Sequence, residues 1–187
     1  MISCPFEYNL TDDELRRLGE MLMTWSHTEH TIGNCLKALL NFNDDEAIAL
    51  VFPLSLDQRV RWLRGLKDRM NTAAQAALDE FVRMLPGFSA IRTNGVHGVI
   101  INDLKDGPLF HLRSRDRTFT KTELFECEEF TNYCARVAYG IRFALFSPAD
   151  ADLPVTLPER PGIPKALEGY IQTGKKAGQP PPAPPQS

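Results

Sequence analysis

Apolar residues recur every three or four positions along the first long stretch of the chain, which is the period of an amphipathic α-helix. The pattern predicts a helix over about 12–40, with an apolar seam of Leu15, Leu18, Leu22, Trp25, Ile32, Leu36 and Leu39 and with Glu29 in its middle. A carboxylate inside an apolar seam is costly to bury unless a cation pairs with it. Two interpretations stay open: the seam is kinked or partly exposed at Glu29, or Glu29 meets Arg92 or His97 and orients it.

Further periodic stretches predict helices over about 44–52, 56–70, 73–85 and 121–146. Another helix is expected to open at Pro86, because proline suits the first turn of a helix better than its interior. Five pairs match the capping box, in which two residues three apart satisfy each other's backbone N–H groups. They are Thr11 with Glu14, Asn43 with Glu46, Ser55 with Gln58, Thr72 with Gln75, and Thr120 with Glu123. Helix starts repeated this often indicate an all-α body.

Two regions of the chain depart from the helical pattern. Segments 109–113 and 117–120 alternate polar and apolar residues, which predicts a short hairpin or ordered loop before the last long helix. From residue 147 onward the chain holds ten of its fourteen prolines and few large apolar residues. The predicted organisation is a helical-bundle domain over 1–147 and a Pro-rich flexible tail over 148–187.

The composition is that of a soluble globular protein, with 187 residues of which 43% are hydrophobic and 24% charged. The chain has no apolar run of transmembrane length and no secretory signal at its start, so we expect a cytoplasmic protein that does not enter a membrane. Four cysteines without a CxxC pair indicate reduced thiols. His27 and His30 stand three residues apart, but no further ligands gather around them in the sequence, so no metal and no cofactor are predicted.

The net charge of −3 argues against a uniformly basic nucleic-acid-binding surface, yet the basic residues are unevenly spread. Residues 59–69 carry five Lys or Arg against one Asp, and residues 105–121 carry five against two. If both stretches lie on one side of the molecule, they are able to hold a polyanion. A solvated helix face followed by a polar loop explains the same pattern equally well.

Arg92 and His97 are the residues of the sequence whose chemistry suggests more than packing. Arginine is always protonated and offers a planar fork of donors to phosphate, and histidine gives or takes a proton near neutral pH. Five residues of α-helix advance roughly 7.5 Å and turn about 140°, so Arg92 and His97 lie on neighbouring faces. A two-fold axis would bring the arginine of one copy near the histidine of the other. We therefore expect a catalytic site shared across a homodimer.

These features together resemble the HEPN superfamily, whose signature is an arginine followed after four to six residues by a histidine. The residues that carry the resemblance are Arg92-Thr93-Asn94-Gly95-Val96-His97-Gly98, with Glu29 in the first long helix. Thr93 stands where members of the family often carry asparagine. The resemblance covers about residues 11–146.

The resemblance implies a dimerising helical bundle and, in many members, metal-independent RNA cleavage that leaves 2′,3′-cyclic phosphate ends, often within toxin–antitoxin or defence systems. Carried onto this chain, Arg92 would bind the scissile phosphate and His97 would act as general base or acid. Asn94 would position the phosphate, and Glu29 would orient Arg92 or His97. The implied partners are RNA, a second copy of the chain and an antitoxin or other protein.

Two functions of different classes remain open at this stage. The first is the HEPN-type endoribonuclease. The second is a non-catalytic helical module that binds nucleic acid or a protein partner, because some members of the superfamily only bind. Packing alone also accounts for Arg92 or His97 taken singly, as an ion-paired arginine and a structural histidine.

Overall fold

A computed structural model describes residues 10–97, 99–103, 107–111, 119–146 and 156–171. Most of these residues are helical, as predicted. The α-helices are α1 (Asp12–Leu40), α2 (Asp44–Leu50), α3 (Leu56–Gly65), α4 (Thr72–His97), α5 (Lys121–Glu126), α6 (Glu128–Phe146) and α7 (Glu168–Ile171). Two short 3-10 helices, η1 (Lys67–Arg69) and η2 (Lys165–Leu167), complete the helical elements. None of the described helices is long and apolar enough to cross a membrane.

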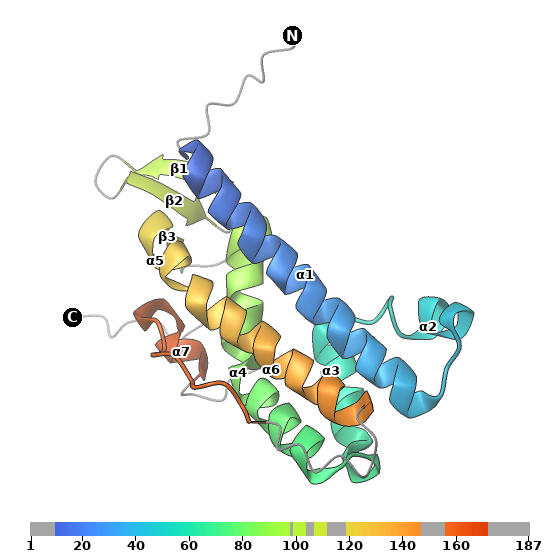
Figure 1. Cartoon of the computed structure of the whole chain (residues 1–187). Helices are drawn as coiled ribbons and strands as arrows, with labels where there is room; N and C mark the ends of the chain where they lie inside the picture. Colours follow the sequence, from blue (N-terminus) through green and yellow to red (C-terminus); the bar gives the residue numbers. More distant parts are fainter. Residues whose placement is uncertain (1–9, 98, 104–106, 112–118, 147–155, 172–187) are drawn as a thin grey trace, which may run out of the picture.

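The body of the molecule is built on three long helices, α1, α4 and α6, which pack against one another (Figure 1). Helices α1 and α6 run in the same direction, and α4 runs the opposite way and contacts the short α7 (Figure 1). Helix α3 lies against α1, so that the bundle has a fourth member along only part of its length. The core they enclose includes Ile32, Leu36, Phe81, Phe88 and Ile141, whose side chains are all fully buried.

Four of the five predicted capping boxes form, at Thr11, Asn43, Ser55 and Thr120. The fifth, predicted at Thr72, does not. Asn71 caps α4 instead, because its side-chain oxygen accepts from the backbone N–H of Ala74 at 2.8 Å. The amide of Asn71 also donates to the carbonyl of Ala144 at 2.7 Å, and this contact ties the start of α4 to the end of α6.

Helix α4 corrects the expectation that Pro86 ends one helix and opens another. The helix runs unbroken from Thr72 to His97 with Pro86 inside it. Proline removes one intrahelical hydrogen bond, but Leu85 and Phe88 on either side of it are buried and hold both halves of α4 against the core. The Arg92–His97 motif therefore closes a long helix and does not open a new one.

The sheet and the last long helix also differ from the prediction in detail. Strands β1 (Val99–Asp103), β2 (Gly107–His111) and β3 (Phe119–Thr120) form an antiparallel sheet in that order. The pairing of β2 with β3 joins the two segments predicted to form a hairpin, whereas β1 was not predicted. The helix predicted over 121–146 is divided at Cys127 into α5 and α6.

The segment 156–171, which belongs to the predicted tail, packs on the bundle. Arg160 makes two hydrogen bonds to the carboxylate of Glu80, at 2.9 and 2.7 Å. Glu80 is buried in α4 and also accepts from the hydroxyl of Tyr133 at 2.7 Å. Leu167 is fully buried. The rest of the predicted tail, 147–155 and 172–187, lies outside the described residues.

The segment 156–171 approaches α4 closely at Gly87, where Ile171 packs. A larger side chain at Gly87 is expected to displace the segment. A Cβ at Gly87 would lie 2.9 Å from Ile171 Cδ1 and 3.3 Å from Phe130 Cζ. Gly87→Ala needs only a small shift of a flexible side-chain end. Gly87→Leu is expected to destabilise the protein by about 1–3 kcal/mol through overpacking, measured by chemical denaturation.

Gly19→Leu is the matched control for this test, because a Cβ at the exposed Gly19 of α1 meets no atom within 4 Å. It should leave the stability unchanged or raise it slightly through helix propensity. Adding Ile171→Ala to Gly87→Leu should restore part of the loss. Equal stability of Gly87→Leu and the natural protein would show that the segment is not seated on Gly87.

Candidate functional site

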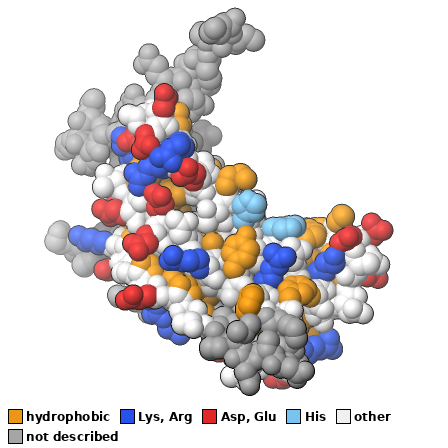
Figure 2. Space-filling view, viewed as in Figure 1, with side chains coloured by type: hydrophobic (Ala, Val, Ile, Leu, Met, Phe, Trp, Pro, Cys, Tyr) orange, Lys and Arg blue, Asp and Glu red, His pale blue; other side chains and the backbone are white. Residues whose placement is uncertain are grey.

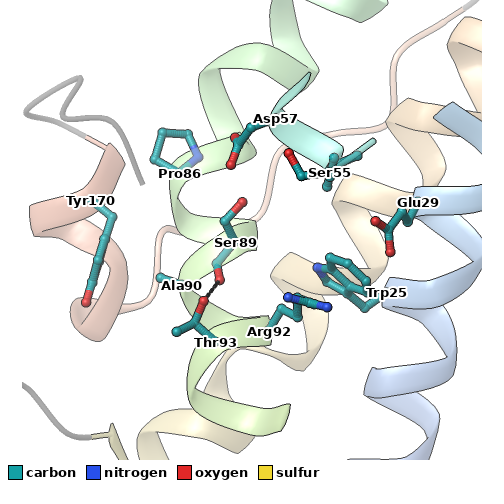
Figure 3. Close-up of a pocket in the computed structure, with 11 residues that line it drawn as sticks. Trp25, Glu29, Ser55, Asp57, Pro86, Ser89, Ala90, Arg92, Thr93 and Tyr170 are labelled. Atoms are coloured by element: carbon teal, nitrogen blue, oxygen red, sulfur yellow. Dashed lines mark hydrogen bonds between the residues drawn. The ribbon is translucent and has the colours of Figure 1, made fainter. Parts of the chain in front are cut away.

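A pocket of about 240 Å³ opens where α3 begins, between α1, α4 and α7 (Figure 3). Its lining residues are Trp25, Glu29, Ser55, Leu56, Asp57, Pro86, Ser89, Ala90, Arg92, Thr93 and Tyr170. The pocket lies at the N-terminal end of α3, whose N-cap is Ser55. Ser55, Leu56 and Asp57 line it there, beside residues of α1 and α4.

The floor of the pocket is one face of α4. Pro86, Ser89, Ala90 and Thr93 are spaced three and four residues apart and so lie along one side of the helix. The hydroxyl of Thr93 donates to the carbonyl of Ser89 at 2.8 Å, which leaves its oxygen lone pairs available as acceptors (Figure 3). These side chains are small, so this face of α4 leaves room for a flat group to lie against it.

Arg92 is held at the pocket by an aromatic ring. Its guanidinium carbon lies 4.4 Å from the centroid of the Trp25 ring, a cation–π contact. The Trp25 ring in turn stacks on Phe88 with 6.0 Å between centroids. Figure 3 shows Arg92 extending from α4 toward Trp25 on α1. The half-buried charge of Arg92 thus has a defined position on the pocket wall.

Glu29 lines the same pocket as Arg92, and its described ion pair is with Arg59. The distance from Glu29 Oε1 to Arg59 Nη2 is 3.8 Å. Arg59 is only 5% exposed, and its N–H groups donate to the carbonyls of Val51, Glu29 and Phe52 at 3.2, 2.9 and 2.6 Å. Burial lowers the pKa of Arg59, an effect that Glu29 opposes. The carboxylate in the apolar seam therefore has a buried cation beside it.

Asn94 and His97 are the other two predicted site residues, and Asn94 lies inside the bundle. Asn94 is 2% exposed, and its side-chain N–H donates to the carbonyl of Ala90 at 2.8 Å. His97 is the last residue of α4, and its side chain lies outside the described part of the structure. The structure brings Arg92 and Glu29 to one pocket and places Asn94 in the interior. The roles of all four residues stay predictions.

Asp57 is a pocket residue that sequence reasoning missed. It lies in the first turn of α3 and makes no hydrogen bond to another described residue. Neighbouring atoms exclude water from its carboxyl group and so raise its pKa, although the residue as a whole is exposed, and the nearby charge of Arg61 opposes the rise. The local sequence around Asp57 carries no signal of this role, since an acid in the first turn of a helix is common.

Other reactive side chains of the described residues lie away from the pocket. Burial raises the pKa of Cys35 and of Cys127 to about 12 and that of Cys134 well above its usual value, so these thiols are not nucleophilic at neutral pH. His30 stacks on Phe52 with 5.3 Å between ring centroids. Within the described ranges no three His, Cys, Asp or Glu side chains gather as a metal site.

Comparison of the chain with protein-family models, with curated proteins and with solved structures gave no match.

Proposed function

We propose that this protein is a metal-independent endoribonuclease of the HEPN type whose site is built around Arg92. The observation that carries the proposal is the guanidinium group of Arg92, positioned 4.4 Å from the Trp25 ring at an open pocket. His97 lies on the same continuous helix, five residues further on. An arginine held in one orientation is suited to bind a phosphate through two parallel N–H groups.

The charges around the pocket are compatible with a phosphate ligand. Glu29 carries a negative charge, but Arg59 lies 3.8 Å from it and offsets that charge. Asp57 is exposed, so solvent screens its negative charge. The positive charge of Arg92 therefore has one partly compensated carboxylate and one solvent-screened carboxylate as pocket neighbours.

The proposed reaction needs no metal, because the side chains supply both proton transfer and charge stabilisation. The ribose 2′-oxygen attacks the phosphorus, the bond to the 5′-oxygen breaks, and a 2′,3′-cyclic phosphate and a 5′-hydroxyl result. The proton of the 2′-hydroxyl passes to a base and the 5′-oxygen receives a proton from an acid. His97 takes one of these roles and the His97 of a second copy the other, while Arg92 stabilises the charge on the phosphate.

The test is cleavage of labelled single-stranded RNA by the purified protein in excess EDTA. The natural protein should cut the RNA and leave 2′,3′-cyclic phosphate ends. His97→Ala should lower the rate by a factor of about 10²–10⁴, the usual contribution of general acid–base catalysis. If the natural protein leaves the RNA intact, or folded His97→Ala cuts it at the same rate, the nuclease proposal fails.

The second candidate, a non-catalytic helical module for a protein partner, is favoured by apolar side chains on the surface. Met23 of α1, Tyr139 and Phe146 of α6 and Trp62 of α3 are 59%, 46%, 58% and 46% exposed. Figure 2 shows apolar side chains between basic ones on the face that α1 and α6 form. Such a surface fits a protein interface, including the homodimer that the nuclease proposal needs. The cleavage assay separates the two candidates, and sedimentation of the natural protein tests the homodimer that the nuclease proposal needs.

A further inference from the structure

The pocket beside Arg92 holds a hydrogen-bond donor that its own chain does not use. Trp25 is 8% exposed, and its indole N–H has no acceptor among the described residues. Figure 3 shows the nitrogen-bearing edge of the Trp25 ring turned toward α4 and the interior of the pocket. A buried donor without an acceptor costs free energy, so a ligand oxygen that reaches it is favoured.

Besides Arg92, the pocket is lined by two carboxylates, which only accept hydrogen bonds when ionised. Glu29 comes from α1 and Asp57 from the first turn of α3, so they approach the pocket from different elements. Glu29 already faces Arg59, whereas Asp57 makes no hydrogen bond within the described residues. Desolvation of Asp57, which raises its pKa, also strengthens any hydrogen bond that its carboxylate accepts.

The size and shape of the pocket suit one flat heterocycle. Its volume of about 240 Å³ lies just below the range of about 300–1,000 Å³ typical of sites for whole small molecules. The floor consists of small side chains of α4, and the aromatic ring of Tyr170 stands at the side opposite Trp25 (Figure 3). Flat bases of single-stranded RNA are commonly bound by such combinations of aromatic rings and polar edges.

Guanine is the RNA base whose edge matches these groups. Its ring N1–H and exocyclic amino group are adjacent donors, and a carboxylate accepts from two parallel donors with its two oxygens. Adenine and cytosine place a ring acceptor beside the amino group, which repels a carboxylate. Uracil places its N–H between two oxygens. The O6 atom of guanine, next to N1–H, is an acceptor suited to an indole N–H.

We propose that the pocket binds a guanine base of the RNA substrate, with Asp57 accepting from its N1–H and amino group and with Trp25 donating to its O6. The guanine site rests on the proposed function only in that the bound base then lies next to a scissile phosphate. With the base in the pocket, Arg92 on the pocket wall meets a phosphate of the same or the adjoining nucleotide. Cleavage is then directed to guanosine positions.

The test measures binding of 5′-GMP, 5′-AMP, 5′-CMP and 5′-UMP to the full chain by tryptophan fluorescence. The chain has two tryptophans, and Trp62 lies outside the pocket, so a Trp62→Phe background leaves Trp25 as the reporter. We expect 5′-GMP to bind at least tenfold more tightly than each other nucleotide. Asp57→Asn places an amide NH₂ group where guanine offers its own N1–H and amino group, so this variant should lose that preference. Its fold is checked by circular dichroism.

Asp45→Asn is the matched control, because Asp45 is an exposed acid in the first turn of α2 and does not line the pocket. It should bind 5′-GMP as the natural protein does. Selective binding of 5′-GMP without RNA cleavage would support the guanine site and defeat the nuclease proposal. Cleavage without preference for guanosine, or equal binding of all four nucleotides, would overturn the guanine site while leaving the nuclease proposal intact.

Discussion

Replacing Arg92 with alanine is expected to lower the rate of RNA cleavage in EDTA by a factor of about 10²–10³, the usual cost of losing a group that stabilises transition-state charge. The fold should survive, since Arg92 is half-buried at the pocket wall and is not part of the fully buried core. The measurement is the single-turnover rate with saturating protein, which separates the chemical step from RNA binding.

Arg92→Lys makes the test more specific. Lysine keeps the positive charge but lacks the planar guanidinium group, which makes two parallel hydrogen bonds to a phosphate and stacks on an aromatic ring. We expect a rate between those of the natural protein and Arg92→Ala. Arg136→Ala, which removes an exposed arginine of α6, should cleave at the natural rate. A folded Arg92→Ala variant that cuts as fast as the natural protein would remove Arg92 from the proposed mechanism.

Replacing Glu80 with alanine is expected to lower the free energy of unfolding by about 2–4 kcal/mol, the loss that follows when one partner of a largely buried ion pair is removed. Glu80 is 5% exposed and accepts hydrogen bonds from Tyr133 and Arg160. Its removal leaves the buried Tyr133 hydroxyl without this acceptor. Arg160 is able to turn to solvent, which keeps the loss from being larger. Urea denaturation measures it.

Asp79→Ala is the matched control for Glu80→Ala, because Asp79 is the neighbouring acid on α4 and pairs with Lys67 at the surface. An exposed pair of this kind contributes at most about 1 kcal/mol. If Asp79→Ala and Glu80→Ala lose the same stability, the buried cluster does not anchor the segment 156–171. Limited proteolysis of that segment gives an independent measure of its release.

The stability that Glu80 contributes should also depend on pH. Burial by itself raises the pKa of Glu80, but hydrogen bonds from Arg160 and Tyr133 outweigh it and bring the pKa below the ordinary value of 4.5. A carboxyl group with a lowered folded-state pKa stabilises the protein fully above its unfolded pKa and less as the pH falls through its folded one. The stability difference between the natural protein and Glu80→Gln should therefore be constant near neutrality and shrink below about pH 4.5.

The helix starts of this chain were predictable because their signals are local. Helix α1 has the predicted bounds, since Thr11 and Glu14 form a capping box at its start and Asn41, with φ of 55°, ends it in the left-handed conformation. Thr72 fails as a cap because Asn71, one residue earlier, performs the same role with a contact to Ala144. Local patterns therefore identify a helix start, and tertiary contacts choose among neighbouring candidates.

The cation that lies beside Glu29 was less predictable. Arg59 shares a basic stretch with Arg61 and Arg64, and nothing in the local sequence marks it as the buried one. The carbonyls that accept from it belong to α1 and to the turn after α2. The placement of Asn94, in contrast, follows from helix geometry. Two residues of helix turn about 200°, so Arg92 and Asn94 face nearly opposite sides.

The packing of segment 156–171 on the bundle was not predicted, for a compositional reason. Its prolines and scarcity of large apolar residues are typical of disordered chains. It needs few apolar residues because two contacts with α4 hold it. Ile171 packs against Gly87, and Arg160 pairs with the carboxylate of Glu80. A short segment is ordered when the surface that receives it is already formed.

The contribution of Tyr170 to the pocket has a consequence for the timing of synthesis. Trp25, Asp57 and Arg92 leave the ribosome well before Tyr170, yet the pocket has its full wall only when α7 lies against α4. In a nascent chain that has completed the bundle, Arg92 therefore lies in a groove that lacks the side formed by Tyr170. The pocket reaches its final form only after residues 156–171 have been translated and have docked, late in the production of each molecule.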